Sequence, residues 1–374
     1  MPTIAHFEHP EAGRKVRVGA CHRDPVRPEH THYDASGFHP DDLPAFVDLR
    51  PHLTPVEDQG DLGSCTANAL AGAVEYLEKR VHGREERVSR LFLYWNERDL
   101  EGKSHEDHGA CLDDGIRALH KDGVCTEKIW PYDIKKVFHR PADHAYDEAE
   151  SHTIDEAHRV KIDLHDMRHC LAEGYPFVFG LTLAKTFDKT GHDGKVRLPD
   201  HDLQGGHAML CVGYSDKDEV FVVRNSWGPK WGEKGYCYIP YAYLANPEFA
   251  HDLWTVRKAH DLDFNQGVGE APQPHGEKET FFAAEDSEEE ESGSDESDEE
   301  ETEEEGEAEE SEEESGEADS EEGDEEESDE ESDESEEDGD EETEEEVEEE
   351  LSELQKQEAA LKAKLAAAKK KNKR

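Results

Sequence analysis

Residues 59–70 read Gln-Gly-Asp-Leu-Gly-Ser-Cys-Thr-Ala-Asn-Ala-Leu, a glycine-broken loop that runs into a segment with helical periodicity. After Cys65, apolar residues recur at steps of four, three and four, as on the buried face of a helix: Leu70, Val74, Leu77 and Val81. Gly83 is expected to end this helix. A thiol at a helix start faces unpaired backbone N–H groups, so a lowered pKa is expected for Cys65. The alternative is that Cys65 is a small buried hydrophobic residue.

The charge of the chain is distributed unevenly. The 374 residues carry a net charge of -56, and 33% of them are hydrophobic. Residues 281–350 hold 46 of the 97 acidic residues and neither Lys nor Arg. Such a run cannot bury enough apolar surface to offset the cost of ordering, so residues 285–350 are predicted to be a disordered acidic tail. Residues 259–284, rich in Gly, Pro and polar residues, are predicted to be a linker.

The last segment, 351–374, is Lys-rich and is predicted to be helical. Apolar residues follow a heptad-like spacing into it: Val347, Leu351, Leu354, Leu361 and Leu365. This helix either associates as a coiled coil or is merely solvated. Its basic end, Lys369 to Arg374, is either a nuclear-targeting or nucleic-acid patch or a partner for the acidic tail.

The N-terminus lacks the pattern of a signal peptide, and we find no apolar run long enough to span a membrane. Seven cysteines, an odd number without a Cys-x-x-Cys pair, fit reduced thiols. The prediction is a cytoplasmic protein with no membrane partner, with nuclear or virion association as alternatives. A metal site is not expected, because the pair His30 and His32 has no second ligand cluster at metal spacing.

Helix patterns come first in the chain and strand patterns second. Helices are expected after Cys65, from Ser89 to about Gly102, from Asp113 to Leu119 and from Asp166 to Glu173. Strands are expected at 177–183, 208–214, 220–224, 236–239 and 253–256. This order indicates an α+β fold with two lobes and a site between them, in a domain spanning residues 46–258. Residues 1–45 are predicted to be an extended segment that lies on this domain.

The strand half offers partners for a reactive thiol. His207 begins an apolar strand, where its imidazole could take a proton from Cys65 and later deliver it to a leaving amine. Asn225 follows the next strand and could orient that ring. Trp227 could shield the His207–Asn225 hydrogen bond from water. Taken alone, His207 is one of 23 histidines, and a structural role explains it as well as an acid/base role does.

Three blocks together resemble the signatures of papain-like cysteine peptidases, across residues 45–256. They are Thr54 to Cys65, Gly206-His207-Ala208 with Val212-Gly213-Tyr214, and Asn225-Ser226-Trp227-Gly228 with Trp231 to Tyr236. In that family the His and Asn lie about 130–150 residues after the Cys. Here His207 lies 142 residues after Cys65, and Asn225 lies 160 after it.

The resemblance implies a papain-like two-lobed fold, with a helical N-terminal lobe and an antiparallel β C-terminal lobe. It also implies that Cys65 is the nucleophile, His207 the acid/base and Asn225 the orienting group. Gln59 resembles the oxyanion-hole side chain. Gly109-Ala110 resembles the glycine pair that binds the substrate backbone, although Ala110 departs from glycine.

Several positions depart from the family pattern. Leu62 replaces a cysteine that is normally disulfide-bonded, and Thr66 replaces the aromatic residue after the nucleophile. The form Gly-Ser-Cys-Thr-Ala-Asn resembles the branch seen in bacteria and large DNA viruses. About 45 residues precede the domain, fewer than the usual inhibitory propeptide, so activation by propeptide removal is not expected. Whether this segment blocks the cleft stays open.

The functional prediction is a cysteine peptidase, an endopeptidase that forms a thioester acyl-enzyme and requires no cofactor. Its expected partners are peptide or protein substrates, with basic proteins attracted to the acidic tail; nucleic acid is not favoured as a partner. The rival is an inactive scaffold whose tail binds basic proteins. Retention of Cys65, His207, Asn225 and Gln59 argues against it. Ligation by the same residues is a third alternative.

Overall fold

The computed structural model describes residues 5–9, 14–37, 42–83, 85–259 and 280–282. All of them belong to the first of two units into which the chain divides, Met1–Glu290. Apart from Ala259 and 280–282, the linker, acidic tail and Lys-rich helix predicted for 259–374 lie outside the described residues. Residues 280–282 contact the β lobe, where the Phe281 ring lies 4.5 Å from that of Phe46.

The first half of the unit is mainly helical. Its helices are α1 (Cys65–His82), α2 (Arg90–Leu100), α3 (Leu112–Lys121) and α4 (Asp143–Ala149), with short 3-10 helices η2 (Arg50–His52), η3 (Ile134–Lys136) and η4 (Glu150–His152). Gly83, with φ 66°, ends α1, and the Ser89 hydroxyl caps α2 by accepting from the Phe92 N–H (3.1 Å). Both helix boundaries predicted from sequence are confirmed.

An antiparallel sheet forms the second half. Its path is β10 (Tyr236–Pro240), β9 (Val220–Arg224), β8 (Leu203–Ser215), β7 (Phe177–Ala184), β11 (Ala250–Ala259) and β6 (Ile154–Arg159), and β4 (Phe46–Asp48) also pairs with β8. Helices α5 (Leu164–Ala172) and α6 (Tyr241–Leu244) and the 3-10 helix η5 (Lys185–Lys189) connect these strands. The predicted α+β class, with helices first and antiparallel strands second, is confirmed.

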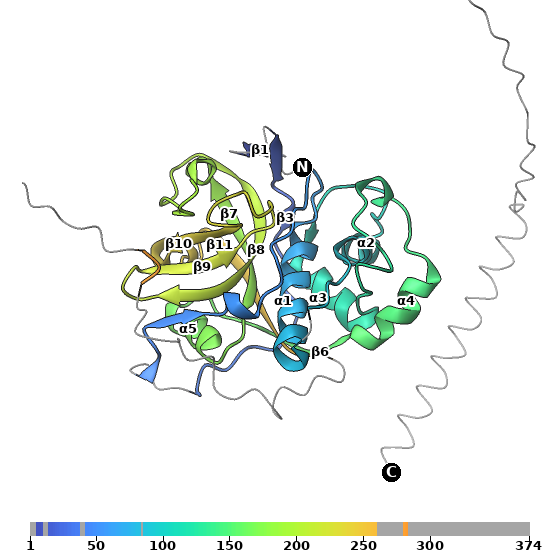
Figure 1. Cartoon of the computed structure of the whole chain (residues 1–374), viewed down its shortest axis with the longest axis horizontal. Coiled ribbons are helices and arrows are strands. Elements are labelled where there is room, and N and C mark those ends of the chain that lie inside the picture. Colours follow the sequence, from blue (N-terminus) through green and yellow to red (C-terminus); the bar gives the residue numbers. More distant parts are fainter. Residues whose placement is uncertain (1–4, 10–13, 38–41, 84, 260–279, 283–374) are drawn as a thin grey trace, which may run out of the picture. The chain divides into compact units, whose positions relative to one another are not determined.

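Helix α1 lies between the two lobes, with α2 and α4 on one side and the strands β7 to β10 on the other (Figure 1). Residues 65–77 of α1 are all buried. Small side chains allow this, since a Cβ on Gly72 would lie 3.3 Å from Leu210 of β8. The start of α1 is therefore held where both lobes meet.

Several elements carry no strong sequence signal. Strand β6 is an edge strand whose outward side chains are charged, so its apolar alternation is weak. The N-terminal residues form β1 (Ala5–Glu8) and β2 (Lys15–Val18), which pair as a hairpin, and β3 (Cys21–His22), which pairs in parallel with β5 (Ala110–Cys111). Such short strands are specified by the residues they pair with and not by their own sequence.

Candidate active site

Cys65 is the first residue of α1, where the loop from Gln59 enters the helix. Hydrogen bonds hold this loop from two sides. The Asn68 side-chain amide donates to the Ser64 carbonyl (2.8 Å), and the Tyr132 hydroxyl donates to the Gln59 carbonyl (2.8 Å). The position of the thiol at the helix start is thus fixed by its neighbours.

His207 on β8 and Asn225 at the end of β9 are hydrogen-bonded, with Nε2 2.8 Å from Oδ1. The same Oδ1 accepts from the Ser226 N–H (2.8 Å). Since this oxygen only accepts, His207 Nε2 carries the hydrogen, and Nδ1 is the basic nitrogen of the neutral ring. Nδ1 is buried and has no hydrogen-bond partner among the described residues.

Ser226 links the two lobes at the site. Its hydroxyl donates to Gln59 Oε1 (2.5 Å), and its carbonyl accepts from the Gln59 N–H (2.8 Å). The Gln59 amide nitrogen donates to the Leu62 carbonyl (2.8 Å), which leaves one N–H of that amide for another acceptor. A continuous series of hydrogen bonds therefore runs from His207 through Asn225 and Ser226 to Gln59.

Trp227 covers the His207 ring. The two rings are stacked with centroids 4.9 Å apart, and Trp227 is 1% exposed. The Phe7 ring meets Trp227 edge-on at 6.2 Å, and His9 Nε2 lies 3.0 Å from the Trp227 carbonyl. One face of the imidazole is thus shielded from water.

The segment around Ala20 lies against the helical lobe beside this site. The Ala110 N–H donates to the Ala20 carbonyl (3.0 Å), and a Cβ on Gly109 would lie 2.0 Å from the same oxygen. A Cβ on Gly63 would lie 3.1 Å from that of Ala20. The positions that the resemblance assigns to a substrate backbone, Gly109 and Ala110, are therefore paired with the chain's own N-terminal segment.

The same segment contacts the β lobe next to His207. The Gly19 N–H donates to the Gly206 carbonyl (3.0 Å), and a Cβ on Gly206 would lie 2.1 Å from the Cys21 carbonyl oxygen. Cys65 and His207 are each 0% exposed. The segment thus crosses from one lobe to the other beside Cys65 and His207, both of which are fully buried.

This cover changes the electrostatics of the thiol. Burial raises the pKa of Cys65 to about 12, against the opposing effect of the backbone amides of Ala208, Thr66 and Cys65 itself. The expectation of a lowered pKa at the helix start is wrong for this covered arrangement. The amides act as expected, but loss of solvation outweighs them.

Burial also lowers the pKa of His207 to about 4, against the opposing effect of the Asn225 hydrogen bond. The unfolded chain takes up this proton near pH 6.5, so stability from this group is present above pH 6.5 and is lost as the pH falls towards 4. We expect unfolding free energy to drop by about 2 kcal/mol from this group between pH 7.5 and pH 5.

Urea unfolding of the native chain and of His207→Asn at these two pH values measures this loss. The other histidines titrate in both chains, so the difference isolates His207. An identical pH dependence in the two chains would contradict the assignment of a neutral, buried imidazole.

Other residues of the site were missed by sequence reasoning. The Thr66 hydroxyl donates to the buried Glu97 (2.7 Å), whose pKa burial raises well above its usual value. Ser226 stands between Asn225 and Trp227, so its block could have suggested a role. Glu97 lies in another helix, and no local pattern connects it to Cys65.

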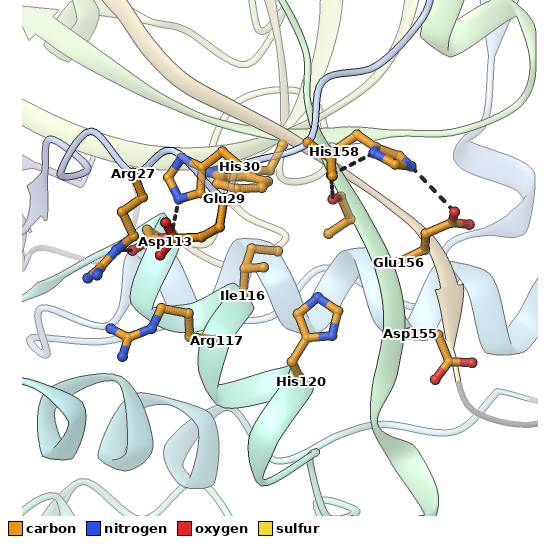
Figure 2. A pocket seen from close by; sticks show the side chains of 13 residues that line it. Arg27, Glu29, His30, Asp113, Ile116, Arg117, His120, Asp155, Glu156 and His158 are labelled. Carbon is orange, nitrogen blue, oxygen red and sulfur yellow. Dashed lines mark hydrogen bonds and ion pairs between the residues drawn. The ribbon is translucent and has the colours of Figure 1, made fainter. Parts of the chain in front are cut away.

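A separate pocket of about 470 Å³ lies between α3 and β6 (Figure 2). His120, Asp155 and Glu156 are among the residues that line it, and Cys65 and His207 are not. His30, one of the two histidines considered for metal, contacts Asp113 there (2.7 Å). This pocket is therefore distinct from the candidate active site.

A family model described as "Papain family cysteine protease" matches residues 43–248, more than half of the chain. The chain belongs to the papain family of cysteine proteases. An uncharacterised peptidase C1-like protein of Acanthamoeba polyphaga mimivirus is 40% identical to this papain-family chain over 237 residues, which cover 60% of the chain and 76% of that protein. Chymopapain of Carica papaya is 29% identical over 220 residues, covering 55% and 58%.

Among solved structures, xylellain, a cysteine protease from Xylella fastidiosa, matches with a TM-score of 0.61 and 36% sequence identity. The match covers 69% of this papain-family chain and 99% of xylellain. The predicted papain-like fold is thus confirmed. The viral and bacterial relatives also agree with the branch that the sequence around Cys65 predicts.

All seven cysteines of this papain-family chain lie in described residues, and all are free and buried. Leu62 at the usual half-cystine position agrees with this. Within the described residues, we find no helix that is both long and apolar enough to cross a membrane.

Proposed function

We propose that this chain is a cysteine endopeptidase that hydrolyses peptide bonds of peptides or proteins through Cys65, His207 and Asn225. The observation that carries the proposal is the hydrogen-bonded series from His207 through Asn225 and Ser226 to Gln59, beside the helix start that holds Cys65. It joins an oriented base to an amide donor, which are the two groups that acyl transfer to a thiol requires.

In the proposed reaction, His207 Nδ1 takes the proton of the Cys65 thiol, and the thiolate attacks the substrate carbonyl carbon. The Asn225 side chain holds the ring by accepting from Nε2. The protonated ring then delivers the proton to the leaving amine, which departs as the thioester forms. Water, deprotonated by the same nitrogen, hydrolyses the thioester and regenerates the thiol.

The oxyanion formed in each step would be stabilised by the Cys65 N–H at the helix start and by the Gln59 side-chain amide. One amide hydrogen of Gln59 is engaged by the Leu62 carbonyl, and the Ser226 hydroxyl holds its oxygen, so the second hydrogen has a defined direction. Such preorganised donors contribute about 10²- to 10³-fold each to the rate.

The N-terminal segment would restrain this activity. It pairs with Ala110 and leaves no room beside Gly206, so a substrate backbone must displace it. Displacement would return water to Cys65, and the amides at the helix start would then lower the pKa of the thiol. The chain as described thus corresponds to a latent form.

One further part of the proposal concerns residues outside the described ones. The acidic tail, residues 285–350, would recruit basic proteins by charge, an attraction that weakens with salt. The scaffold alternative has no observation in its favour, because a scaffold needs neither the base nor the amide donor.

Labelling with a thiol-directed epoxide peptide tests the reaction. The folded full chain is expected to take up one label, located by mass spectrometry at Cys65, and Cys65→Ala none. Cys125→Ala, which removes another buried thiol, is the matched control and should be labelled as the native chain is. Absence of label at Cys65 even in a folded Arg17→Ala chain, which lacks the contact of the N-terminal segment with Asp107, would overturn the proposal, and so would peptide cleavage that survives Cys65→Ala.

A further inference from the structure

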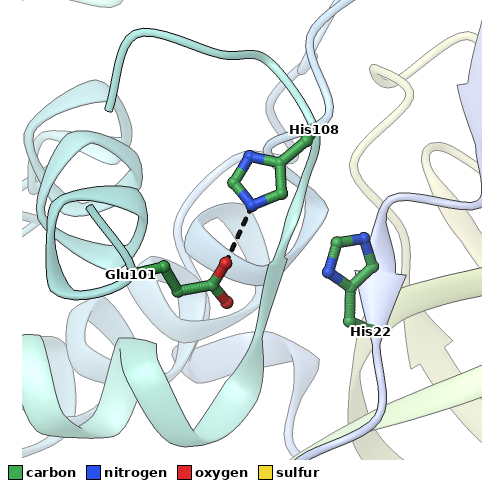
Figure 3. Close-up of side chains that lie close together, drawn as sticks. All are labelled: His22, Glu101 and His108. Atoms are coloured by element: carbon green, nitrogen blue, oxygen red, sulfur yellow. Dashed lines mark hydrogen bonds and ion pairs between the residues drawn. The ribbon is translucent and has the colours of Figure 1, made fainter. Parts of the chain in front are cut away.

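Three side chains with metal-binding atoms meet where the N-terminal segment crosses the helical lobe. His22 lies on β3, Glu101 directly follows α2, and His108 precedes β5 (Figure 3). One ligand atom from each lies within 4.8 Å of the others. His108 Nε2 is 2.9 Å from the Glu101 carboxylate, and His22 faces this pair from across the gap.

Two ring nitrogens of this cluster lack partners. His22 Nε2 and His108 Nδ1 are buried and have no hydrogen-bond partner among the described residues. A buried polar atom without a partner costs about 1–3 kcal/mol, so a structure usually supplies one. A cation held between the two rings would accept a lone pair from His22 Nε2 and remove the cost at that atom, while His108 faces the same point through Nε2.

The donor set is specific in its chemistry. Imidazole nitrogens suit zinc, copper and nickel, whereas calcium and magnesium take oxygen donors. Two His and one Glu supply three ligands of a tetrahedral zinc site and leave the fourth for water. Lys103 Nζ, 3.1 Å from Glu101, competes for the carboxylate, but its side chain is 48% exposed and can move into solvent.

We propose that His22, Glu101 and His108 bind a divalent transition-metal ion of the zinc class, and that this ion fastens the N-terminal segment across the candidate active site. The sequence does not predict this site, because its ligands lie 79 and 7 residues apart and only the fold brings them together. Metal binding is inferred from the three side chains alone. Control of peptidase activity by the ion rests in addition on the proposed function.

The location links the ion to access to Cys65. His22 follows Cys21, whose carbonyl packs on Gly206 beside His207, and β3 pairs with Ala110, two residues after His108. The three ligands meet only when β3 is docked. An ion that binds the docked form alone, present at 100 times its dissociation constant, favours that form about 100-fold.

A second possible ligand group shares Glu101 and adds Cys111 and Asp114. In that group the Arg117 guanidinium lies 2.7 Å from the Asp114 carboxylate, and all three ligands belong to the helical lobe. An ion there would not hold β3. Substitution of His22 separates the two groups, because His22 belongs only to the first.

The first experiment measures Zn²⁺ binding to the full chain carrying Cys65→Ala, which removes the catalytic thiol as a competing ligand. Competition with a chromophoric chelator is expected to show one tight site. His22→Gln and His108→Gln should each lose it. His105→Gln is the matched control, because His105 lies in the same loop, 73% exposed beside Glu106, and should keep the site. The acidic tail is common to all four chains.

Thermal unfolding without zinc checks that the variants fold. Equal tight binding by folded His22→Gln, His108→Gln and the control would overturn the site. Loss in His108→Gln with retention in His22→Gln would also overturn it, since the ion would then lie in the helical lobe alone.

The second experiment measures epoxide labelling of Cys65 in the full chain with and without Zn²⁺. Saturating zinc is expected to slow labelling about 100-fold in the native chain and in His105→Gln, with no slowing in His108→Gln. Equal slowing in all three would mean that zinc acts at Cys65 directly and would overturn the fastening role. A chain that binds zinc as expected but cleaves no peptide without zinc, even after Arg17→Ala removes the contact of the N-terminal segment with Asp107, would leave the site standing and refute the proposed function instead.

Discussion

The Arg17→Ala chain is expected to react with a thiol-directed epoxide peptide about 100-fold faster than the native chain. The Arg17 guanidinium on β2 is paired with the Asp107 carboxylate and also donates to the Asp107 carbonyl (2.6 Å). The two side chains are 9% and 18% exposed, so the pair is largely buried. Loss of one partner of a buried pair costs about 3 kcal/mol or more, which is about 100-fold in the population of displaced segment.

Lys15→Ala is the control for this prediction. Lys15 also lies on β2, but its pair with Glu8 is 3.7 Å long and both side chains are more than half exposed. Such a surface pair contributes little, so labelling should be unchanged. If Arg17→Ala folds normally and is labelled at the native rate, docking of the segment does not limit access to Cys65.

In the released Arg17→Ala chain, His207→Ala is expected to lower kcat/KM for a peptide substrate by at least about 10⁴-fold. In the proposed reaction, His207 supplies both the base for the thiol and the acid for the leaving amine, and loss of one member of such a unit costs nearly as much as loss of all. Release of the amine product under steady-state conditions measures this.

The size of the loss in kcat should distinguish the proposed role of Gln59 from that of His207. We expect Gln59→Ala to lower kcat by about 10²- to 10³-fold, because one of the proposed oxyanion donors is removed. His201→Ala, an exposed substitution shortly before β8, is the control and should cleave normally. A His207→Ala chain that retains most of its activity would show that another group acts as base.

The sequence was informative about the side chains proposed to react because each stands in a short local block. Cys65 is followed by a helical period, and His207 and Asn225 flank apolar strands. The structure places Asn225 directly after β9, as predicted, whereas β8 begins at Leu203, so that His207 lies inside this strand and not at its start. The hydrogen bond between Ser226 and Gln59 was not predictable in the same way, since it joins segments 167 residues apart.

The cover over the site was least predictable. The segment around Cys21 has no periodicity of its own, and its conformation is set by contacts with Ala110 and Gly206 on two different lobes. Burial of Cys65 follows from these contacts, which is why the expected lowering of its pKa failed. A helix start fixes the local field at a thiol, but the solvent that reaches it depends on the rest of the fold.

The pairing of β3 with β5 has one more consequence, because the segment is covalently part of the chain it covers. A peptide joined by a short connection competes at an effective concentration that can reach the millimolar range, whatever the concentration of the protein. Dilution therefore does not open the cleft. A substrate must bind tightly enough to displace the covalently attached N-terminal segment. The apparent Michaelis constant of the closed chain therefore includes the free-energy cost of undocking β3.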